Sequence, residues 1–344
     1  MNKKFKNLFL VLVVFFITIF LSGCKNNQVS SEDGEVIRLK FSDQNSEASS
    51  VYQWMVEFKR IVEEKSDKSI IIDLYPNASL VSYDIEPLQA GIVDFIQYVP
   101  SSASDLDSRL AAFDAPYIYD NPNHRLNSFN MDTSEPLKVV NESLKEKNVI
   151  MLSAFCSGYR HITANFPIRN LDEMKGAKIR VVPADLYLRL FQSFGAAATP
   201  MAFTEVSTAL ITNVIDGQEN PLSVIVQNSL YEIQSDLMLT GHMPTNNAMF
   251  MNYETYKSLS EENQKIIRSS AFEASKIMDA RIIEEEAEYL ETCKEHGMTV
   301  WDESNGLEVE QFKNKALDIY DYYSDQWGDL VDLIGNVDKE GDLK

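Results

Sequence analysis

The chain has 344 residues, with 31 Lys and Arg against 52 Asp and Glu, and a formal charge of −21. A surface of this sign repels nucleic acid and anionic lipid, so neither is expected as a partner. The length exceeds what one ordinary hydrophobic core requires, which predicts two domains.

The first 23 residues predict a signal peptide. Three lysines precede an apolar run from Leu8 to Leu21, which is too short for a comfortable transmembrane helix. The run ends in Leu21-Ser22-Gly23-Cys24, the pattern of a bacterial lipobox in which the Cys24 thiolate accepts lipid. We therefore expect an extracytoplasmic protein anchored to the membrane through lipidated Cys24. A plain signal anchor, or cleavage elsewhere, is the alternative.

Residues 24–35 are rich in Asn, Ser, Gln and Gly and predict a flexible tether. The folded body is expected to begin near Val36. Removing the signal peptide removes three lysines and no acid, so the mature chain carries about −24. An anionic ligand would therefore have to be held by buried positive charge.

Strands and helices alternate along the body. In the first section, alternating or apolar runs predict strands at 36–41, 70–74 and 93–99, and helices at 49–65 and 84–90. In the second, they predict strands at 149–155 and 178–182, helices at 184–194 and 204–212, and a strand and turn at 214–218. A strand at 247–252 could rejoin the first sheet. The pattern predicts an α/β fold with a largely parallel sheet and helices on both faces.

Residues 260–296 contain no Pro and no Gly before Gly297. Ser260 is a plausible N-cap and Gly297 a plausible C-cap. A single helix of this length would be about 55 Å long and could run along both domains. Two helices with a kink are the alternative.

Known catalytic and metal-binding signatures are missing from the sequence, which has no GxSxG, HExxH, P-loop or GxGxxG after a strand. The four histidines do not have metal-ligand spacing, and Cys156 and Cys293 lie far apart. We expect no enzyme activity, metal or cofactor. The two cysteines could form a disulfide or remain as buried thiols.

Three segments could hold an anion: 158–160, 175–181 and 216–221. Arg suits a carboxylate because its planar guanidinium donates two parallel hydrogen bonds. Arg180, however, alternates with Ile179 and Val181, so it could equally lie on the solvent face of a strand. Arg160 could equally be a surface residue.

Several segments together resemble the solute-binding proteins of tripartite ATP-independent periplasmic (TRAP) transporters. Residues 171–181 are similar to the family's D-x-x-K-G-x-K-x-R signature. Further similar segments follow the family's order, at 74–80, 91–95, 114–117, 195–206 and 215–222. The resemblance covers nearly all of residues 36 to 327.

This resemblance implies a periplasmic-binding-protein-like fold of two domains with a hinged cleft and a long helix spanning both. The implied domains are approximately 36–156 with 246–284, and 157–245 with 285–335. In the family, the Arg at the position of Arg180 forms the main salt bridge to the solute carboxylate. In the family, the residues at the positions of Arg160 and Asn220 help to bind the same carboxylate. The aromatic residue at the position of Phe203 lies against the ligand.

Other positions depart from the sialic-acid receptors of this family. Gln44 occupies the position of an Asn in those receptors, and Val99 occupies the position of a Glu. A residue near Ser82 or Tyr83 occupies the position of an Asp. Sialic acid is therefore not the expected ligand. The candidates for selectivity contacts are Gln44, Tyr83, Pro100, Ser101 and Tyr159.

The resemblance thus predicts a receptor for a small organic acid that delivers it to an ion-gradient-driven TRAP permease. A sugar acid such as a uronate is expected first, and a dicarboxylate or keto acid next. We expect a monomer. The alternatives are an exported enzyme acting on sugar acids and a binding protein of an ATP-driven importer.

Overall fold

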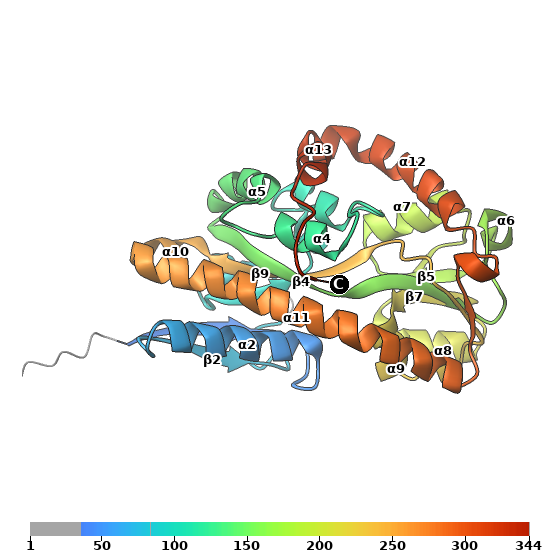
Figure 1. Ribbon diagram of the computed structural model, residues 1–344, viewed down its shortest axis with the longest axis horizontal. Coiled ribbons are helices and arrows are strands. Elements are labelled where there is room, and N and C mark those ends of the chain that lie inside the picture. Colours follow the sequence, from blue (N-terminus) through green and yellow to red (C-terminus); the bar gives the residue numbers. More distant parts are fainter. Residues whose placement is uncertain (1–35, 83, 344) are drawn as a thin grey trace, which may run out of the picture. The chain divides into compact units, whose positions relative to one another are not determined.

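Figure 1 shows the computed structural model, which describes residues 36–82 and 84–343. The predicted signal peptide, Cys24, the tether and Tyr83 lie outside the described residues. From Ile37 onward the chain forms one unit by its internal contacts. The boundaries expected between two domains within this unit stay a prediction.

Within the described residues, ten strands form one sheet. Its order is β2 (Ile70–Tyr75), β1 (Ile37–Ser42), β3 (Phe95–Tyr98), β9 (Pro244–Asn252), β4 (Val149–Ala164), β7 (Gly217–Pro221), β5 (Ile179–Val181) and β6 (Thr199–Pro200). β8 (Asp236–Met238) also pairs with β4, and β10 (Thr299–Trp301) pairs with β8. The strands of the first and second sections thus belong to one continuous sheet.

The sheet is mixed, and the prediction of a largely parallel sheet is wrong at its centre. β1 is parallel to β2 and β3, and β5 is parallel to β6 and β7. β9 rejoins the first section as expected, but it is antiparallel to both neighbours, β3 and β4. The reason is that β9 returns from the second section and enters the sheet from the opposite end.

Strand β4 joins the two sections. We expected it to end at Phe155, but it continues to Ala164 through register shifts at 151/153 and 156/159. Such bulges bend a strand. The first part of β4 pairs with β9, and the last part pairs with β7 and β8. The polar and charged residues after Phe155 therefore lie in a strand rather than in a loop.

Helices α2 (Ser50–Lys65) and α7 (Asp185–Ser193) match their predicted ranges closely. α3 is shorter, at Glu86–Gln89, and α8 (Val206–Ile211) follows a short 3-10 helix, η3 (Phe203–Glu205). The remaining helical elements are η1 (Pro100–Ala103), η2 (Ser108–Asp114), α4 (Pro122–Ser128), α5 (Glu135–Lys145), α6 (Leu171–Met174), α9 (Leu222–Gln227), η4 (Leu230–Glu232), α10 (Tyr253–Ser258), η5 (Glu303–Asn305), α12 (Val309–Trp327) and α13 (Leu330–Gly335).

Helix α11 (Glu261–Glu295) is a single helix of 35 residues, as predicted. Ser260 caps it, because its hydroxyl accepts a hydrogen bond from the backbone N–H of Asn263, and Gly297 follows it at φ +92°. The helix lies beside α2 along one part and beside α9 along another (Figure 1). Ala274 belongs to the hydrophobic cluster of α2, and Cys293 to that of α8 and α9. One helix therefore packs against elements of both predicted domains.

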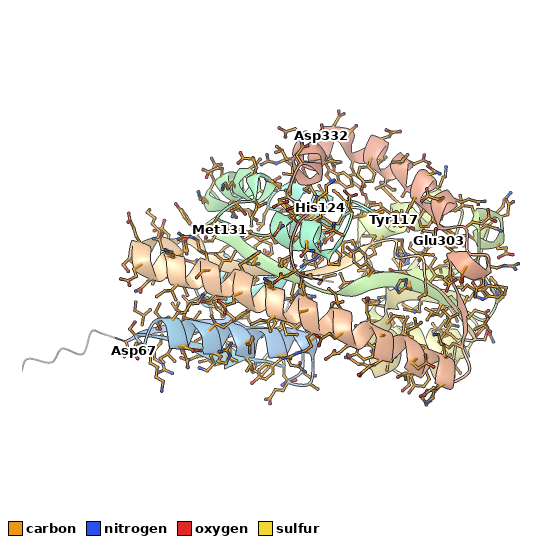
Figure 2. All side chains as sticks on the ribbon, in the orientation of Figure 1. Asp67, Tyr117, His124, Met131, Glu303 and Asp332 are labelled. Atoms are coloured by element: carbon orange, nitrogen blue, oxygen red, sulfur yellow. The ribbon has the colours of Figure 1, made fainter. Side chains whose placement is uncertain are left out.

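Side chains fill the space between these elements (Figure 2). His124 of α4, for example, lies against α13, with 2.7 Å between its Nε2 and the Ile334 carbonyl oxygen. Cys156 in β4 and Cys293 in α11 are both buried free thiols. Among the described residues, no helix is long and apolar enough to cross a membrane, and no cluster of His, Cys, Asp or Glu is placed to hold a metal ion.

Candidate ligand-binding site

A cavity of about 530 Å³ is lined by residues from both sections of the sheet. It is lined by the loop after β1, by β3, β9, β4, β7 and β5, and by α9. Five of the predicted ligand residues line it: Arg180, Arg160, Asn220, Phe203 and Gln44. The volume falls in the usual range for small-molecule sites.

Arg160 of β4 and Glu219 of β7 form a buried ion pair in the wall of the cavity. Arg160 Nε lies 2.5 Å from Glu219 Oε2, and Arg160 Nη2 lies 2.9 Å from Oε1. Arg160 also donates to the Glu219 carbonyl at 2.7 Å and to Asn220 Oδ1 at 3.0 Å. Its guanidinium lies 5.3 Å from the centre of the Tyr187 ring, a cation–π distance.

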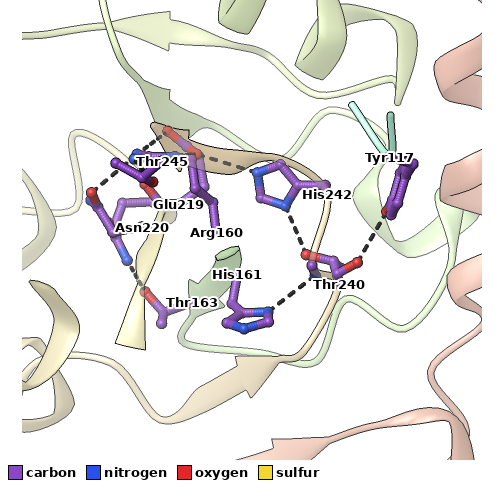
Figure 3. Close-up of polar contacts among 11 residues, drawn as sticks. Tyr117, Arg160, His161, Thr163, Glu219, Asn220, Thr240, His242 and Thr245 are labelled. Carbon is purple, nitrogen blue, oxygen red and sulfur yellow. Dashed lines mark hydrogen bonds and ion pairs between the residues drawn. The ribbon is translucent and has the colours of Figure 1, made fainter. Parts of the chain in front are cut away.

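His242 extends this network on the far side of Glu219 (Figure 3). Its Nε2 lies 3.3 Å from Glu219 Oε2, and its Nδ1 lies 2.8 Å from the Thr240 hydroxyl. Burial lowers the pKa of His242, so the imidazole is neutral at pH 7. Burial alone would raise the pKa of Glu219, but attraction to Arg160 and the bond to His242 lower it to about 2. Glu219 is therefore ionised and neutralises Arg160.

Arg180 of β5 has no such partner. Its side chain is buried, with 3% of the residue exposed, and no acidic side chain of the described residues lies within ion-pair distance. Nε and Nη2 both donate to the Met201 carbonyl, at 2.9 and 2.7 Å. Burial lowers the pKa of Arg180 to about 10, so it remains charged at neutral pH.

The solvent-facing alternative for Arg180 is therefore wrong, because all three residues of β5 are buried. Phe203 closes one side of the guanidinium, with 5.7 Å between Arg180 Cζ and the ring centre. Asn220 Oδ1 accepts from Arg160, and its Nδ2 donates to Gln218. Asn220 thus links Arg160 of β4 to Gln218 of its own strand.

Three other candidates are placed differently. Ser101 lies in η1, outside the cavity lining, and its backbone N–H donates to Asp114 Oδ2 at 2.7 Å. Tyr159 lines two other cavities, one of them against α11, and not this one. Tyr83 lies outside the described residues. A ligand contact by any of the three stays a prediction.

The cavity also contains polar residues that the sequence pattern did not single out, among them Gln97, Ser157, Thr245 and Asn247. Gln97 and Asn247 lie in strands β3 and β9 that were predicted from their apolar neighbours. The sequence feature that could have identified them is an amide side chain within an otherwise apolar strand. Glu219 stands in the quoted 216–221 segment, but nothing in the sequence pairs it with Arg160.

A family model described as bacterial extracellular solute-binding protein, family 7, matches residues 41–326. The sialic acid-binding periplasmic protein SiaP of Vibrio cholerae is 31% identical over 265 residues, covering 76% of this chain and 82% of that protein. The 2,3-diketo-L-gulonate-binding periplasmic protein YiaO of Escherichia coli is 26% identical, covering 82% of this chain and 85% of that protein.

Solved structures agree with the fold described above. A TRAP periplasmic solute binding protein from Ochrobactrum anthropi superposes with a TM-score of 0.80 at 27% identity, covering 87% of this chain and 94% of that one. One from Sulfitobacter with bound β-D-galacturonate has a TM-score of 0.75 at 25% identity, covering 87% of this chain and all of that one. The relatives are receptors and not enzymes. The chain therefore belongs to family 7 of the bacterial extracellular solute-binding proteins, and it is a binding protein of the TRAP transporter class.

Proposed function

We propose that this receptor binds a small organic acid by pairing its carboxylate with Arg180. A sugar acid such as a uronate is the first expected ligand, and a dicarboxylate or keto acid the next. The proposal depends on one observation, which is that Arg180 is a buried cation at the cavity without an acidic partner among the described residues. Arg160, by contrast, is already neutralised by Glu219.

The physical reason is the cost of an uncompensated buried charge. A desolvated guanidinium gains most from an anion that accepts its hydrogen bonds directly. The mature chain carries about −24 overall, so an anion is attracted only near such a local positive charge. Arg180 would therefore decide both where the ligand binds and which group of the ligand enters first.

The names of the relatives support this ligand class. Receptors for sialic acid, 2,3-diketo-L-gulonate and β-D-galacturonate are among them, and all three compounds are carboxylic acids. The residues that replace the sialic-acid contacts, Gln44 and Val99, favour a different sugar acid. Both residues line the cavity.

Capture would proceed by closure of the two proposed domains, 36–156 with 246–284 and 157–245 with 285–335. A ligand favours the closed state only through contacts that the open state lacks. Closure also excludes water, which strengthens the pairing between Arg180 and a carboxylate. The loaded receptor, a monomer held at the membrane by lipidated Cys24, would then deliver the solute to an ion-gradient-driven TRAP permease.

A thermal-shift screen of carboxylates, followed by calorimetry on each ligand found, tests the proposal. Arg180→Ala should cost about 2–5 kcal/mol of binding free energy. Arg180→Lys should recover little of it, because a point charge cannot make the two-pronged contact. Arg160→Ala should cost less than Arg180→Ala.

Arg189→Ala is the matched control, since it removes the same charge from an α7 residue paired with Asp185 outside the cavity. It should bind as the wild type does. The uncharged amide of the ligand should bind far more weakly than the acid. The proposed carboxylate site would be contradicted if Arg180→Ala bound the ligand with wild-type affinity, or if the wild type bound the acid and the amide equally well.

A further inference from the structure

The cavity lining carries one net positive charge. Among its described residues the only ionisable side chains are Arg160 and Arg180, and Arg160 is paired with Glu219 directly behind it. One carboxylate therefore neutralises the site. A second carboxylate would stand in the cavity without a cation, inside a protein that is itself strongly negative.

The rest of the lining is neutral and rich in hydrogen-bonding groups. Of the twenty lining residues, seven carry amides and six carry hydroxyls, against five apolar ones. No acidic side chain lines the cavity within the described residues, and Phe203 is the one aromatic ring there. The site therefore offers neither a counter-ion nor an aromatic cage for an ammonium group.

Three of the amides, one serine and Arg180 lie on consecutive strands of the sheet. In order, Gln97 is on β3, Asn247 on β9, Ser157 on β4, Asn220 on β7 and Arg180 on β5. Four strand spacings in a flat sheet amount to about 19 Å. Arg180 and the Gln97–Asn247 pair therefore stand at opposite ends of this row of side chains, which forms the polar wall of the cavity.

The Gln97–Asn247 pair leaves one acceptor unused. Gln97 Nε2 donates to Asn247 Oδ1 at 3.2 Å, and Asn247 Nδ2 donates to the Ser157 hydroxyl at 3.1 Å. These bonds orient both amides, while Gln97 Oε1 receives no hydrogen bond from any described residue. A ligand hydroxyl can donate to this oxygen, whereas a carboxylate has only acceptors and would be repelled.

We propose that the ligand is a polyhydroxylated monocarboxylate, with its carboxylate on Arg180 and its hydroxyl groups read by Gln97 and Asn247, so that the site rejects dicarboxylates. This proposal rests on the function proposed above. It narrows the ligand class to aldonates and uronates, and it makes Gln97 a specificity-determining residue.

Calorimetry with matched acid pairs tests this. D-gluconate and D-glucarate, and D-galactonate and galactarate, share a carbon skeleton and differ at C6, where a hydroxymethyl group replaces a second carboxylate. D-glucuronate, D-galacturonate, succinate and hexanoate complete the panel. We expect the best monocarboxylate sugar acid to bind at least about tenfold tighter than its aldarate partner and than succinate, and hexanoate to bind weakest, because it leaves the polar wall unpaired.

Variants at the polar wall then test whether these residues determine the preference for monocarboxylates. Gln97→Lys supplies the missing cation and should shift preference toward the aldarate. Gln44→Lys does the same from a more exposed lining position, in case Gln97→Lys does not fold. Gln326→Lys, on the exposed face of α12 and outside the cavity, makes the same charge change and should leave the preference unaltered.

The inference is overturned if succinate or an aldarate binds more tightly than every monocarboxylate sugar acid, or if no sugar acid of the panel binds. It is also overturned if the lysine variants keep the ligand preference of the wild type. These outcomes are separate from failure of the proposed function, which shows instead as undiminished binding of whichever acid is recognised when Arg180 is replaced by Ala.

Discussion

Arg160 and Glu219 hold each other across the paired strands β4 and β7, with Nε–Oε2 at 2.5 Å and Nη2–Oε1 at 2.9 Å. Both side chains are buried. The pair ties the strand that joins the two sections of the sheet to the strand that carries Asn220. It also removes Arg160 as a free cation, which leaves Arg180 to attract the ligand.

Glu219→Gln should destabilise the protein, because Arg160 would remain buried without a compensating charge. We expect a loss of about 3–5 kcal/mol in the free energy of unfolding, measured by urea denaturation at pH 7. Glu173→Gln is the control, since Glu173 pairs with Arg169 at a partly exposed site and should cost less than about 1 kcal/mol. Equal effects of the two changes would contradict a special role for the buried pair.

Phe203→Ala should weaken ligand binding modestly while preserving the preference for an acid over its amide. The ring contacts the Arg180 guanidinium, and a cation–π contact of this kind contributes about 0.5–1 kcal/mol. Phe166→Ala is a close control, because Phe166 is 38% exposed against 37% for Phe203 but lies outside the cavity. Calorimetry on one ligand should separate the two variants by a few-fold in affinity.

Asp114→Asn should change how stability depends on pH. Burial raises the pKa of Asp114 from 3.8 to about 6, despite hydrogen bonds from Ser101 and Asn246. The folded state therefore binds this proton more tightly than the unfolded state does. The resulting stabilisation is fully present below about pH 4 and is lost as the pH rises to about 6.

A difference of about two pKa units corresponds to about 3 kcal/mol. Urea unfolding of both proteins from pH 4 to pH 7 should therefore show the wild type losing about this much relative to Asp114→Asn. All other titrating groups are shared, so they cancel in the comparison. Parallel stability curves would mean that Asp114 does not hold its proton in the folded state.

Cys24→Ser should abolish membrane retention of the processed protein, because no thiol remains to accept lipid. Cell fractionation and labelling with a radioactive fatty acid would measure this. A diacyl anchor is expected in the wild type, since a single chain binds a membrane only marginally. Retention of a processed mutant at the wild-type level would exclude lipidation at this residue.

The site could be predicted in part from the sequence. Arg180, Arg160, Asn220, Phe203 and Gln44 all line one cavity, and three of them (Arg180, Asn220 and Phe203) stand in segments that resemble the family's motifs. Gln97 and Asn247 could not be predicted as site residues. A polar residue in a buried strand gives the same sequence pattern whether its side chain faces a cavity or a structural hydrogen-bond partner. Tyr159 precedes Arg160 directly and Ser101 is two residues after Val99, yet both lie outside the cavity lining.

Local patterns were sufficient to predict α11, α2 and the first strands, because caps, glycines and apolar periodicity act within one element. The continuation of β4 beyond Phe155 depended on pairing with segments more than fifty residues later in the chain. The antiparallel direction of β9 depended on pairing with segments more than eighty residues earlier. The charge state of the site was also decided only in three dimensions. Glu219 and Arg160 are 59 residues apart in the chain, and their contact compensates the charge of Arg160 while Arg180 stays free for a ligand. Charge compensation depends on distance in space, which the order of residues does not contain.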